Sequence, residues 1–265
     1  MRVAHLSDVH LTTLQSVRRA YGLRCRAVRF GRSADPSVRA QRLRSALDAV
    51  VASGADHLVI SGDLTELGDD AEFERFAEVL ADAAIDPGDV TLVPGNHDAY
   101  TTADGWRRAL AGPLAPWART SARPGPIEVV DRGDIVFVPI DVTRFQSVVR
   151  SGGELTREAA RELDANASDP AMKHRIVVLV LHHPPFPKHD HAAWRLIDSL
   201  RGSEHVAALM DRHRGLYLMH GHLHQVIDRD RSFGAPGVAD DGDEPRVRLY
   251  DVRGGALESA GLFSA

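Results

Sequence analysis

Five short polar blocks in the sequence carry side chains that could bind metal ions. Aspartate, asparagine and histidine supply carboxylate, amide and imidazole ligands, and metal ions held in this way can activate water for hydrolysis. Any single block is weak evidence, because short polar motifs are common in ordinary loops. The blocks are Asp8-Val9-His10, Gly62-Asp63, Gly95-Asn96-His97-Asp98, His182-His183 and His220-Gly221-His222-Leu223-His224.

The composition also favours imidazole and carboxylate as the metal ligands. The 265 residues include 14 histidines but only one cysteine, Cys25, which excludes an internal disulfide framework and a cysteine-rich metal site. A net charge of -5 argues against a general nucleic-acid binder, which would carry a basic excess. No apolar run is long enough to form a signal-peptide core or to span a membrane. We therefore expect a cytoplasmic protein.

The polar blocks follow short apolar runs that are typical of β-strands. These runs alternate with longer amphipathic stretches, which predicts an α/β fold. Because the carboxyl ends of parallel strands form a common binding crevice, we expect the five blocks to gather at one rim. Thr156 and Ser203 are the expected N-caps of two helices. The predicted strands cover residues 2–6, 57–60, 90–93, 135–140, 176–181 and 216–219, and the predicted helices cover 39–53, 71–84, 156–166 and 203–213.

Two segments depart from this alternation, although residues 1–265 are expected to form a single domain. The C-terminal portion, 226–265, is rich in predicted strands at 226–230, 246–252 and 256–263, which suggests an antiparallel or mixed sheet edge. Residues 14–44 form an arginine-rich insertion directly after the first polar block. Such a segment could reach over the site and contact a phosphate or an anionic membrane surface, or it could be a solvated basic helix pair.

The order and approximate spacing of the blocks resemble those of the calcineurin-like metallophosphoesterases. The resemblance extends from Asp8 to His224. It implies a sandwich of two mixed β-sheets flanked by α-helices, with a dinuclear metal site at the carboxyl ends of the strands. The motifs that carry it are Asp8-x-His10, Gly62-Asp63, Gly95-Asn96-His97-Asp98, His182 and Gly221-His222-x-His224.

The same resemblance implies which residues bind each metal ion. Asp63 would bridge the two ions, with one carboxylate oxygen for each. The mixed oxygen and nitrogen ligands suit Mn²⁺, Fe or Zn²⁺ better than Mg²⁺ or Ca²⁺. The glycines at 62, 95 and 221 are expected to adopt an unusual φ that turns the next side chain toward the metal. The first ion would be held by Asp8, His10, Asp63 and His224, and the second by Asp63, Asn96, His182 and His222.

The implied chemistry is hydrolysis of a phosphate ester. A water between two metal ions loses its proton near neutral pH, and the resulting bridging hydroxide would attack phosphorus in line with the leaving group. His97 would donate a proton to that group, and Asp98 would hydrogen-bond to the His97 imidazole. Candidate substrate contacts, for which plain loop positions are the alternative, are His183, His189, Arg24 and Arg26.

The substrate is less well defined by the sequence than the chemistry is. Three motifs are similar to the class III cyclic-nucleotide phosphodiesterases, which favours a phosphodiester substrate. The alternatives are a UDP-sugar-lipid pyrophosphohydrolase, a phosphomonoesterase and, in another class, a non-catalytic scaffold. Peripheral membrane contact through residues 18–44 and a homodimer are left open. The three motifs are Leu6-Ser7-Asp8, Ser61-Gly62-Asp63-Leu64-Thr65 and Pro94-Gly95-Asn96-His97-Asp98.

Overall fold

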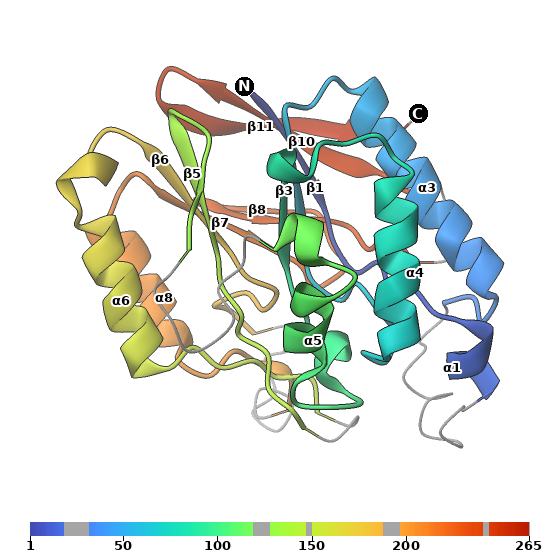
Figure 1. Ribbon diagram of the computed structural model, residues 1–265. Helices are drawn as coiled ribbons and strands as arrows, with labels where there is room; N and C mark the ends of the chain where they lie inside the picture. The colour runs from blue at the N-terminus through green and yellow to red at the C-terminus, as the bar shows by residue number, and fades with distance from the viewer. Residues whose placement is uncertain (19–31, 119–127, 147–149, 188–196, 241–243, 265) are drawn as a thin grey trace.

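Two β-sheets packed face to face form the centre of the molecule, with helices on the outer side of each (Figure 1). They are seen in a computed structural model that describes residues 1–18, 32–118, 128–146, 150–187, 197–240 and 244–264. The predicted α/β sandwich of two mixed sheets is confirmed. In sheet order, the first sheet comprises β11 (Ala256–Phe263), β10 (Val247–Arg253), β1 (Arg2–Leu6), β2 (His57–Ser61) and β3 (Val90–Val93). The second comprises β4 (Val130–Asp131), β5 (Ile135–Pro139), β6 (Ile176–Val180), β7 (Leu216–His220), β9 (Ser232–Gly234) and β8 (Ile227–Arg229).

The helices form the outer layers, and each covers one sheet. Three of them, α3, α4 and α5, pack on the first sheet, whereas α6 and α8 pack on the second. All predicted strands and helices are present, and their ends lie within three residues of the predicted ones. The helices are α1 (Leu14–Arg18), α3 (Pro36–Ala52), α4 (Asp70–Ala81), α5 (Gly105–Ala111), α6 (Arg157–Ala167) and α8 (Ser203–Arg212).

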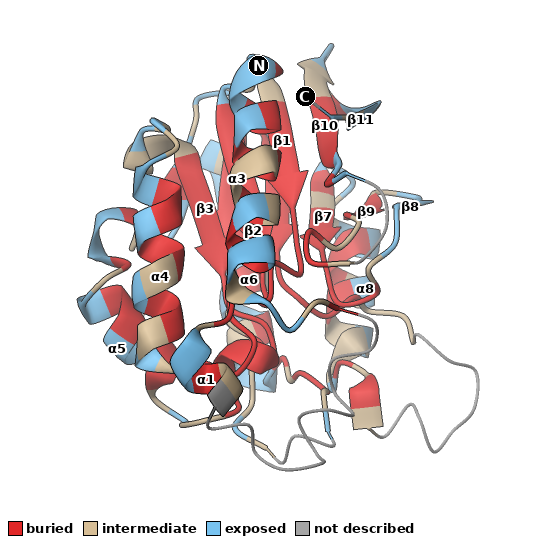
Figure 2. Cartoon of the chain, turned by 90° about the vertical axis from the view of Figure 1, so that its right-hand side faces the viewer, coloured by how far each residue is buried: buried red, intermediate tan, exposed pale blue. Residues whose placement is uncertain are grey.

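Alternation along the strands separates the apolar core into layers. In β1, Val3 packs between the two sheets, whereas Ala4 and Leu6 pack against the helices of the first sheet. Successive side chains of a strand point to opposite faces, so this strand is buried on both sides, as Figure 2 shows. Burial on both faces explains why the strands read as nearly continuous apolar runs in the sequence.

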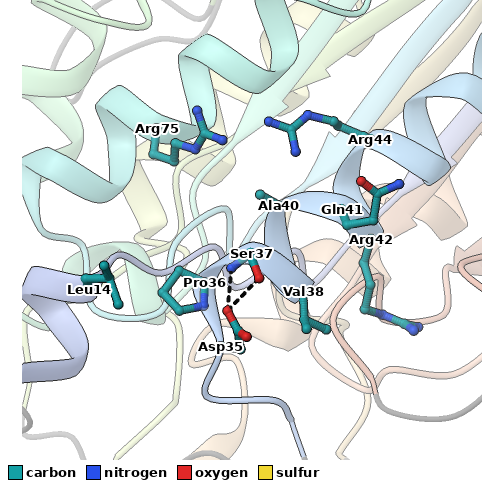
Figure 3. A pocket seen from close by; sticks show the side chains of 10 residues that line it. All are labelled: Leu14, Asp35, Pro36, Ser37, Val38, Ala40, Gln41, Arg42, Arg44 and Arg75. Atoms are coloured by element: carbon teal, nitrogen blue, oxygen red, sulfur yellow. Dashed lines mark hydrogen bonds between the residues drawn. The ribbon is translucent and has the colours of Figure 1, made fainter.

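Local capping explains where the helices begin. Asp35 precedes α3, and its carboxylate accepts hydrogen bonds from the backbone and hydroxyl of Ser37 at 2.8 and 2.7 Å (Figure 3). Thr156 caps α6 as predicted, because its hydroxyl accepts from the backbone of Ala159. The prediction for Ser203 is wrong. Gly202 is the N-cap of α8, with a left-handed φ of 77°, and Ser203 is already helical.

The C-terminal strands complete both sheets. Strand β10 pairs antiparallel with β1 and with β11, whereas β9 pairs parallel with β7 and antiparallel with β8. The tail therefore forms mixed edges, as expected from the sequence. It also returns the chain to the carboxyl end of β1, because Ser7 forms a parallel bridge with Gly237.

The basic insertion lies only partly within the described residues. Residues 19–31, which include Arg24 and Arg26, lie outside the described part of the chain. The end of the predicted insertion belongs instead to α3, where Arg39 is 1% exposed and therefore part of the packed layer. Its burial contradicts a solvated basic helix at this point. Among the described residues, no helix is long and apolar enough to cross a membrane.

Candidate metal centre

The predicted ligands occupy loops at the carboxyl ends of parallel strands. Strands β1, β2 and β3 are parallel to one another, and so are β5, β6 and β7. Backbone hydrogen bonds tie the loops together. Asp8 N donates to Gly62 O at 3.0 Å, His10 N donates to Asp63 O at 2.8 Å, and Gly221 N donates to His182 O at 3.1 Å. The last bond joins two loops of the second sheet.

Several of the predicted ligand residues adopt a left-handed backbone conformation, which is uncommon for residues other than glycine. Strain of this kind persists only where the surrounding structure enforces it, and it is concentrated at functional sites. The loops therefore aim these side chains at a cost in backbone energy. The φ angles are 54° at Asp8, 47° at His10, 51° at Asp63, 65° at His222 and 54° at His224.

Two of the three glycines beside these residues serve a different purpose from the predicted one. Only Gly62 has a positive φ, of 100°. Gly95 and Gly221 do not, and the prediction of an unusual φ is wrong for these two. A side chain at Gly95 would collide with the Asp63 carboxylate, and one at Gly221 would collide with the hydroxyl of Ser7. These two glycines provide space for the close approach of the loops.

Carboxylate and imidazole atoms converge at the centre of this rim. His224 Nε2 lies 3.1 Å from Asp8 Oδ1, and His182 Nε2 lies 3.2 Å from Asp63 Oδ2. His10 Nε2 lies 3.9 Å from the same Asp8 oxygen and 3.7 Å from the same Asp63 oxygen. Ligand atoms at these separations can surround one or two metal ions, and every one of these residues except His224 is fully or almost fully buried.

Hydrogen bonds outside the centre orient the ligands. His182 Nδ1 donates to the carbonyl of Ser61 at 2.8 Å, and His224 Nδ1 contacts the carboxylate of Asp240 at 2.7 Å, so each ring turns its Nε2 to the centre. Asn96 donates its amide N–H to the hydroxyl of Tyr100 at 2.8 Å. Its amide oxygen is buried and has no hydrogen-bond partner among the residues that the structure describes. A metal ion would satisfy this oxygen, and the donor set therefore fits a metal centre.

The charges of the centre show what holds it together without metal. Burial alone would raise the pKa of Asp63, but the positive charge of His182 lowers it to about 2. Burial opposes protonation of His182 and His224, but the nearby carboxylates raise their pKa values to about 9 and about 10. The carboxylates thus favour the protonated form of both imidazoles. A metal ion binds the neutral imidazole, so the same carboxylates make metal binding depend on pH.

The two carboxylate oxygens of Asp63 have different surroundings. Its Oδ1 accepts a hydrogen bond from the backbone N–H of His97 at 2.8 Å, whereas its Oδ2 faces both His10 and His182. The bridging role of Asp63 stays a prediction.

The loop after β7 brings His222 to the same rim. Its backbone N–H donates to Asp8 Oδ2 at 3.2 Å, and its ring centre lies 5.4 Å from that of His182. His222 Nε2 lies 3.1 Å from the carbonyl oxygen of Asp198. Since this carbonyl accepts from Nε2, metal binding by His222 would use Nδ1.

His97 lies beside the proposed ligands and, like His182, uses its Nδ1 to contact a backbone carbonyl. Its Nδ1 donates to the carbonyl of Glu66 at 2.7 Å, and its ring packs edge-on against His10 with 4.4 Å between centres. Burial lowers the pKa of His97 below its ordinary value, although the charges of Asp63 and Glu66 oppose this effect. A carbonyl can only accept, so Nε2 is the nitrogen that can exchange a proton with a substrate.

The expected hydrogen bond from Asp98 to the His97 imidazole is contradicted. The Asp98 carboxylate instead accepts from the backbone of Leu64 and Gly95 and from both the backbone and hydroxyl of Thr65. Burial, reinforced by the charge of Asp63, raises the pKa of Asp98 to about 7. Asp98 therefore joins the second ligand loop to the third, so its role is to position Asp63 and Asn96.

The other predicted substrate contacts are not supported by the described structure. His183 is fully buried and its Nε2 donates to the carbonyl of Ser151, so it holds a neighbouring loop against the centre, and its contact with a substrate stays a prediction. His189, Arg24 and Arg26 lie outside the described residues.

Several residues of the site were not predicted. Asp240 orients His224 from 16 residues away, in a link that gave no local signal. Glu66, four residues from the second block's glycine, accepts from two buried arginines, Arg32 and Arg39. Its place directly after the second block was the available signal. The arginines were seen only as members of a basic run.

Comparison with known proteins agrees with this geometry. A model of the family described as calcineurin-like phosphoesterase matches residues 1–226. No curated protein sequence matches significantly. The chain superimposes on the crystal structure of a dimetal phosphatase from Danio rerio with a TM-score of 0.69 and 16% identity, covering 99% of this chain and 96% of that one.

Two further structures are larger than this chain, which spans about half of each. A purple acid phosphatase from Lupinus luteus seeds gives a TM-score of 0.58 and 10% identity over 94% of this chain and 49% of that one. A putative 5'-nucleotidase from Staphylococcus aureus gives a TM-score of 0.51 and 14% identity over 99% of this chain and 53% of that one. At these identities the likeness establishes the fold alone. The family match shows that the chain belongs to the calcineurin-like phosphoesterases, whose centre holds two metal ions.

Proposed function

We propose that this calcineurin-like phosphoesterase is a metal-dependent phosphodiesterase. The observation that carries the proposal is the convergence of two buried carboxylates, Asp8 and Asp63, with three imidazoles at one rim. When bound, a metal pair lowers the pKa of a water and neutralises charge on phosphoryl oxygens. The unsatisfied oxygen of Asn96 supports a ligand role for this residue.

The proposed ligands remain those suggested by the sequence. The first ion would be held by Asp8, His10, Asp63 and His224, and the second by Asp63, Asn96, His182 and His222. Their mixture of carboxylate, amide and imidazole atoms supports Mn²⁺ or Fe, with Zn²⁺ as the alternative. Cysteine contributes to neither set.

His97 is proposed as the proton donor to the leaving group. The Glu66 carbonyl fixes Nδ1, and the ring lies against the proposed ligand His10, which supports a role for Nε2 in proton transfer. A diester leaves as an alkoxide when the alcohol is not acidic, and a proton donor then matters more than it does for an aryl ester.

Phosphodiester hydrolysis is preferred because three of the ligand motifs resemble the cyclic-nucleotide phosphodiesterases. A phosphomonoesterase and a UDP-sugar-lipid pyrophosphohydrolase are the alternatives, and the second would place the basic segment on a lipid-linked substrate or a membrane surface. We propose a cytoplasmic location. The intact and buried ligand set argues against a non-catalytic scaffold.

A substrate panel separates these alternatives. The protein, reconstituted with Mn²⁺, is assayed on cyclic nucleotides, linear diesters, monoesters and UDP-linked lipids. Faster hydrolysis of diesters than of the other classes supports the proposal. Preference for monoesters or for the lipid-linked diphosphate would replace the substrate class but keep the metal chemistry. Absence of hydrolysis on the whole panel would contradict an esterase.

A further inference from the structure

A buried arginine from the basic segment lies at the edge of the metal centre. The side chain of Arg32 is only 5% exposed, and its Nη1 donates to His10 Nε2 at 3.0 Å. The same nitrogen of His10 faces the carboxylates of Asp8 and Asp63. The guanidinium group therefore lies within the reach of a phosphate held at this centre.

A second buried arginine and Glu66 hold Arg32 in this position. Arg32 Nη2 donates to one oxygen of Glu66 at 3.3 Å, and Arg39 Nη1 donates to the other at 3.0 Å. Arg39 Nη1 also donates to the carbonyl of His10 at 2.6 Å, and its Nε donates to the carbonyl of Ser33 at 2.6 Å. Arg39 is carried by α3, whose capped start is shown in Figure 3.

Arg32 and Arg39 share the carboxylate of Glu66, and all three side chains are at least nine-tenths buried. Arg32 also lies near the carboxylates of Asp8 and Asp63, through its contact with His10. Metal ions would neutralise these two carboxylates once they bind. Arg32 would then lie beside metal-bound carboxylates, and an incoming anion would be favoured next to its guanidinium group.

Metal binding also requires a change at His10. An arginine can only donate, so the Nε2 that accepts from Arg32 is the lone pair that a metal ion needs. The ion and the guanidinium cannot share it. Two cations side by side repel each other, and an anionic oxygen between them removes the repulsion.

We propose that Arg32 binds a non-bridging oxygen of the scissile phosphate in the metal-loaded enzyme, an inference that rests on the proposed function. Glu66 and Arg39 are its positioning residues. Both phosphate monoesters and diesters carry such an oxygen, and a guanidinium recognises it through charge-assisted hydrogen bonds. Arg32 thereby becomes a substrate-binding residue that the ligand motifs do not include.

The test measures phosphate binding and turnover in the Mn²⁺-loaded protein. Inorganic phosphate is titrated calorimetrically into the wild type, Arg32→Ala and Arg32→Lys, and hydrolysis of bis(p-nitrophenyl) phosphate and p-nitrophenyl phosphate is followed in parallel. Arg32→Ala should raise the phosphate Kd, and the KM for both esters, by about 10- to 100-fold. Arg32→Lys should lie between the two, because it keeps the charge but loses the planar fork. Bound manganese per chain should not fall.

Arg44→Ala is the matched control. Arg44 belongs to the same basic run, but its side chain lines a surface groove of about 690 Å³ on the outer side of α3 (Figure 3). The Arg44→Ala variant should bind phosphate with the same affinity as the wild type. An unchanged phosphate Kd in Arg32→Ala, or loss of manganese from that variant, would overturn the assignment. If Arg32→Ala does not fold, the same measurements on Arg32→Lys decide. A wild type that hydrolyses neither ester would instead contradict the proposed function.

Discussion

At the scale of single residues, several residues of the centre have a strained backbone. Several also use one side-chain atom in a hydrogen bond to a neighbouring loop. Asp63 and His182 each use one atom to hold a neighbouring loop and turn the other to the centre. Local motifs in the sequence suggested which residues could be ligands, but they could not predict the hydrogen bonds between the loops. The contacts of Asp98 with Thr65 and of Asp63 with His97 join loops about 30 residues apart.

Replacing His97 by alanine tests the proton donor. Turnover should fall by about 10²- to 10⁴-fold, because the leaving group would then depart without a proton. Bound manganese should stay at the wild-type level, since His97 is not among the proposed ligands. Steady-state kinetics and metal analysis of one preparation measure both. Loss of metal together with activity would make His97 a ligand.

Asp240 is expected to increase metal affinity by orienting the His224 imidazole. Its carboxylate holds His224 Nδ1 at 2.7 Å, and partners of this kind typically contribute 10- to 100-fold to metal affinity, so Asp240→Ala should weaken Mn²⁺ binding by about that factor. Asp240→Asn keeps an oxygen acceptor and should lose less. Competitive titration with a chelating dye measures the affinities. Equal affinities in all three proteins would show that the contact does not orient a ligand.

At the scale of elements, strands and helices with long, regular apolar patterns could be predicted from the sequence, whereas short elements could not. The strands that carry ligand loops are continuous apolar runs, and they were located within two residues. Helix α5 has seven residues and begins at a glycine, and β9 has three residues, so neither shows a period long enough to detect. Ser203 looked like a cap by residue type. Gly202 took that position because its left-handed φ suits glycine.

Glu72, near the start of α4, should make the free energy of unfolding depend on pH. The buried carboxylate of Glu72 accepts from the backbone of Leu67 at 2.8 Å and so braces the loop that follows Asp63. Burial raises the pKa of Glu72 to about 7. The folded protein therefore holds this proton more tightly than the unfolded chain, and the contribution to the free energy of unfolding declines as pH rises from about 4.5 to above 7.

The matching variant is Glu72→Gln, which cannot titrate. Between pH 5 and pH 8 the wild type should lose up to about 3 kcal/mol of unfolding free energy relative to this variant. Urea denaturation of the metal-free proteins at both pH values measures the difference. Glu78→Gln, at an exposed position of the same helix, is the control. If the unfolding free energies of the wild type and Glu72→Gln differ by the same amount at pH 5 and pH 8, the raised pKa of Glu72 is contradicted.

At the scale of the whole molecule, the centre joins the two sheets. Asp8, His10, Asp63 and Asn96 follow strands of the first sheet, whereas His182, His222 and His224 follow strands of the second. The family and the α/β sandwich could be predicted from the sequence because these motifs recur in order. Contacts such as Arg32 with His10 could not, because no local pattern links a basic run to a buried imidazole.

Metal ions that draw ligands from both sheets should stabilise the fold. Binding to the folded state alone adds about 4 kcal/mol when the free ion is at 1,000 times its Kd. For a chain of this size, the midpoint of thermal unfolding should rise by about 10 °C. Calorimetry with and without Mn²⁺ measures the shift. Identical midpoints at saturating Mn²⁺ would contradict a centre shared by both sheets.

The most direct test of the metal-dependent esterase is a titration of the metal-stripped protein with Mn²⁺ during hydrolysis of bis(p-nitrophenyl) phosphate. Activity should be absent at the start, rise with added metal and level off near about two ions per chain. Asp63→Ala should bind less metal and stay inactive, because both proposed sites lose a ligand. Hydrolysis that is unaffected by stripping, or a fully loaded wild type that hydrolyses nothing, would contradict the account.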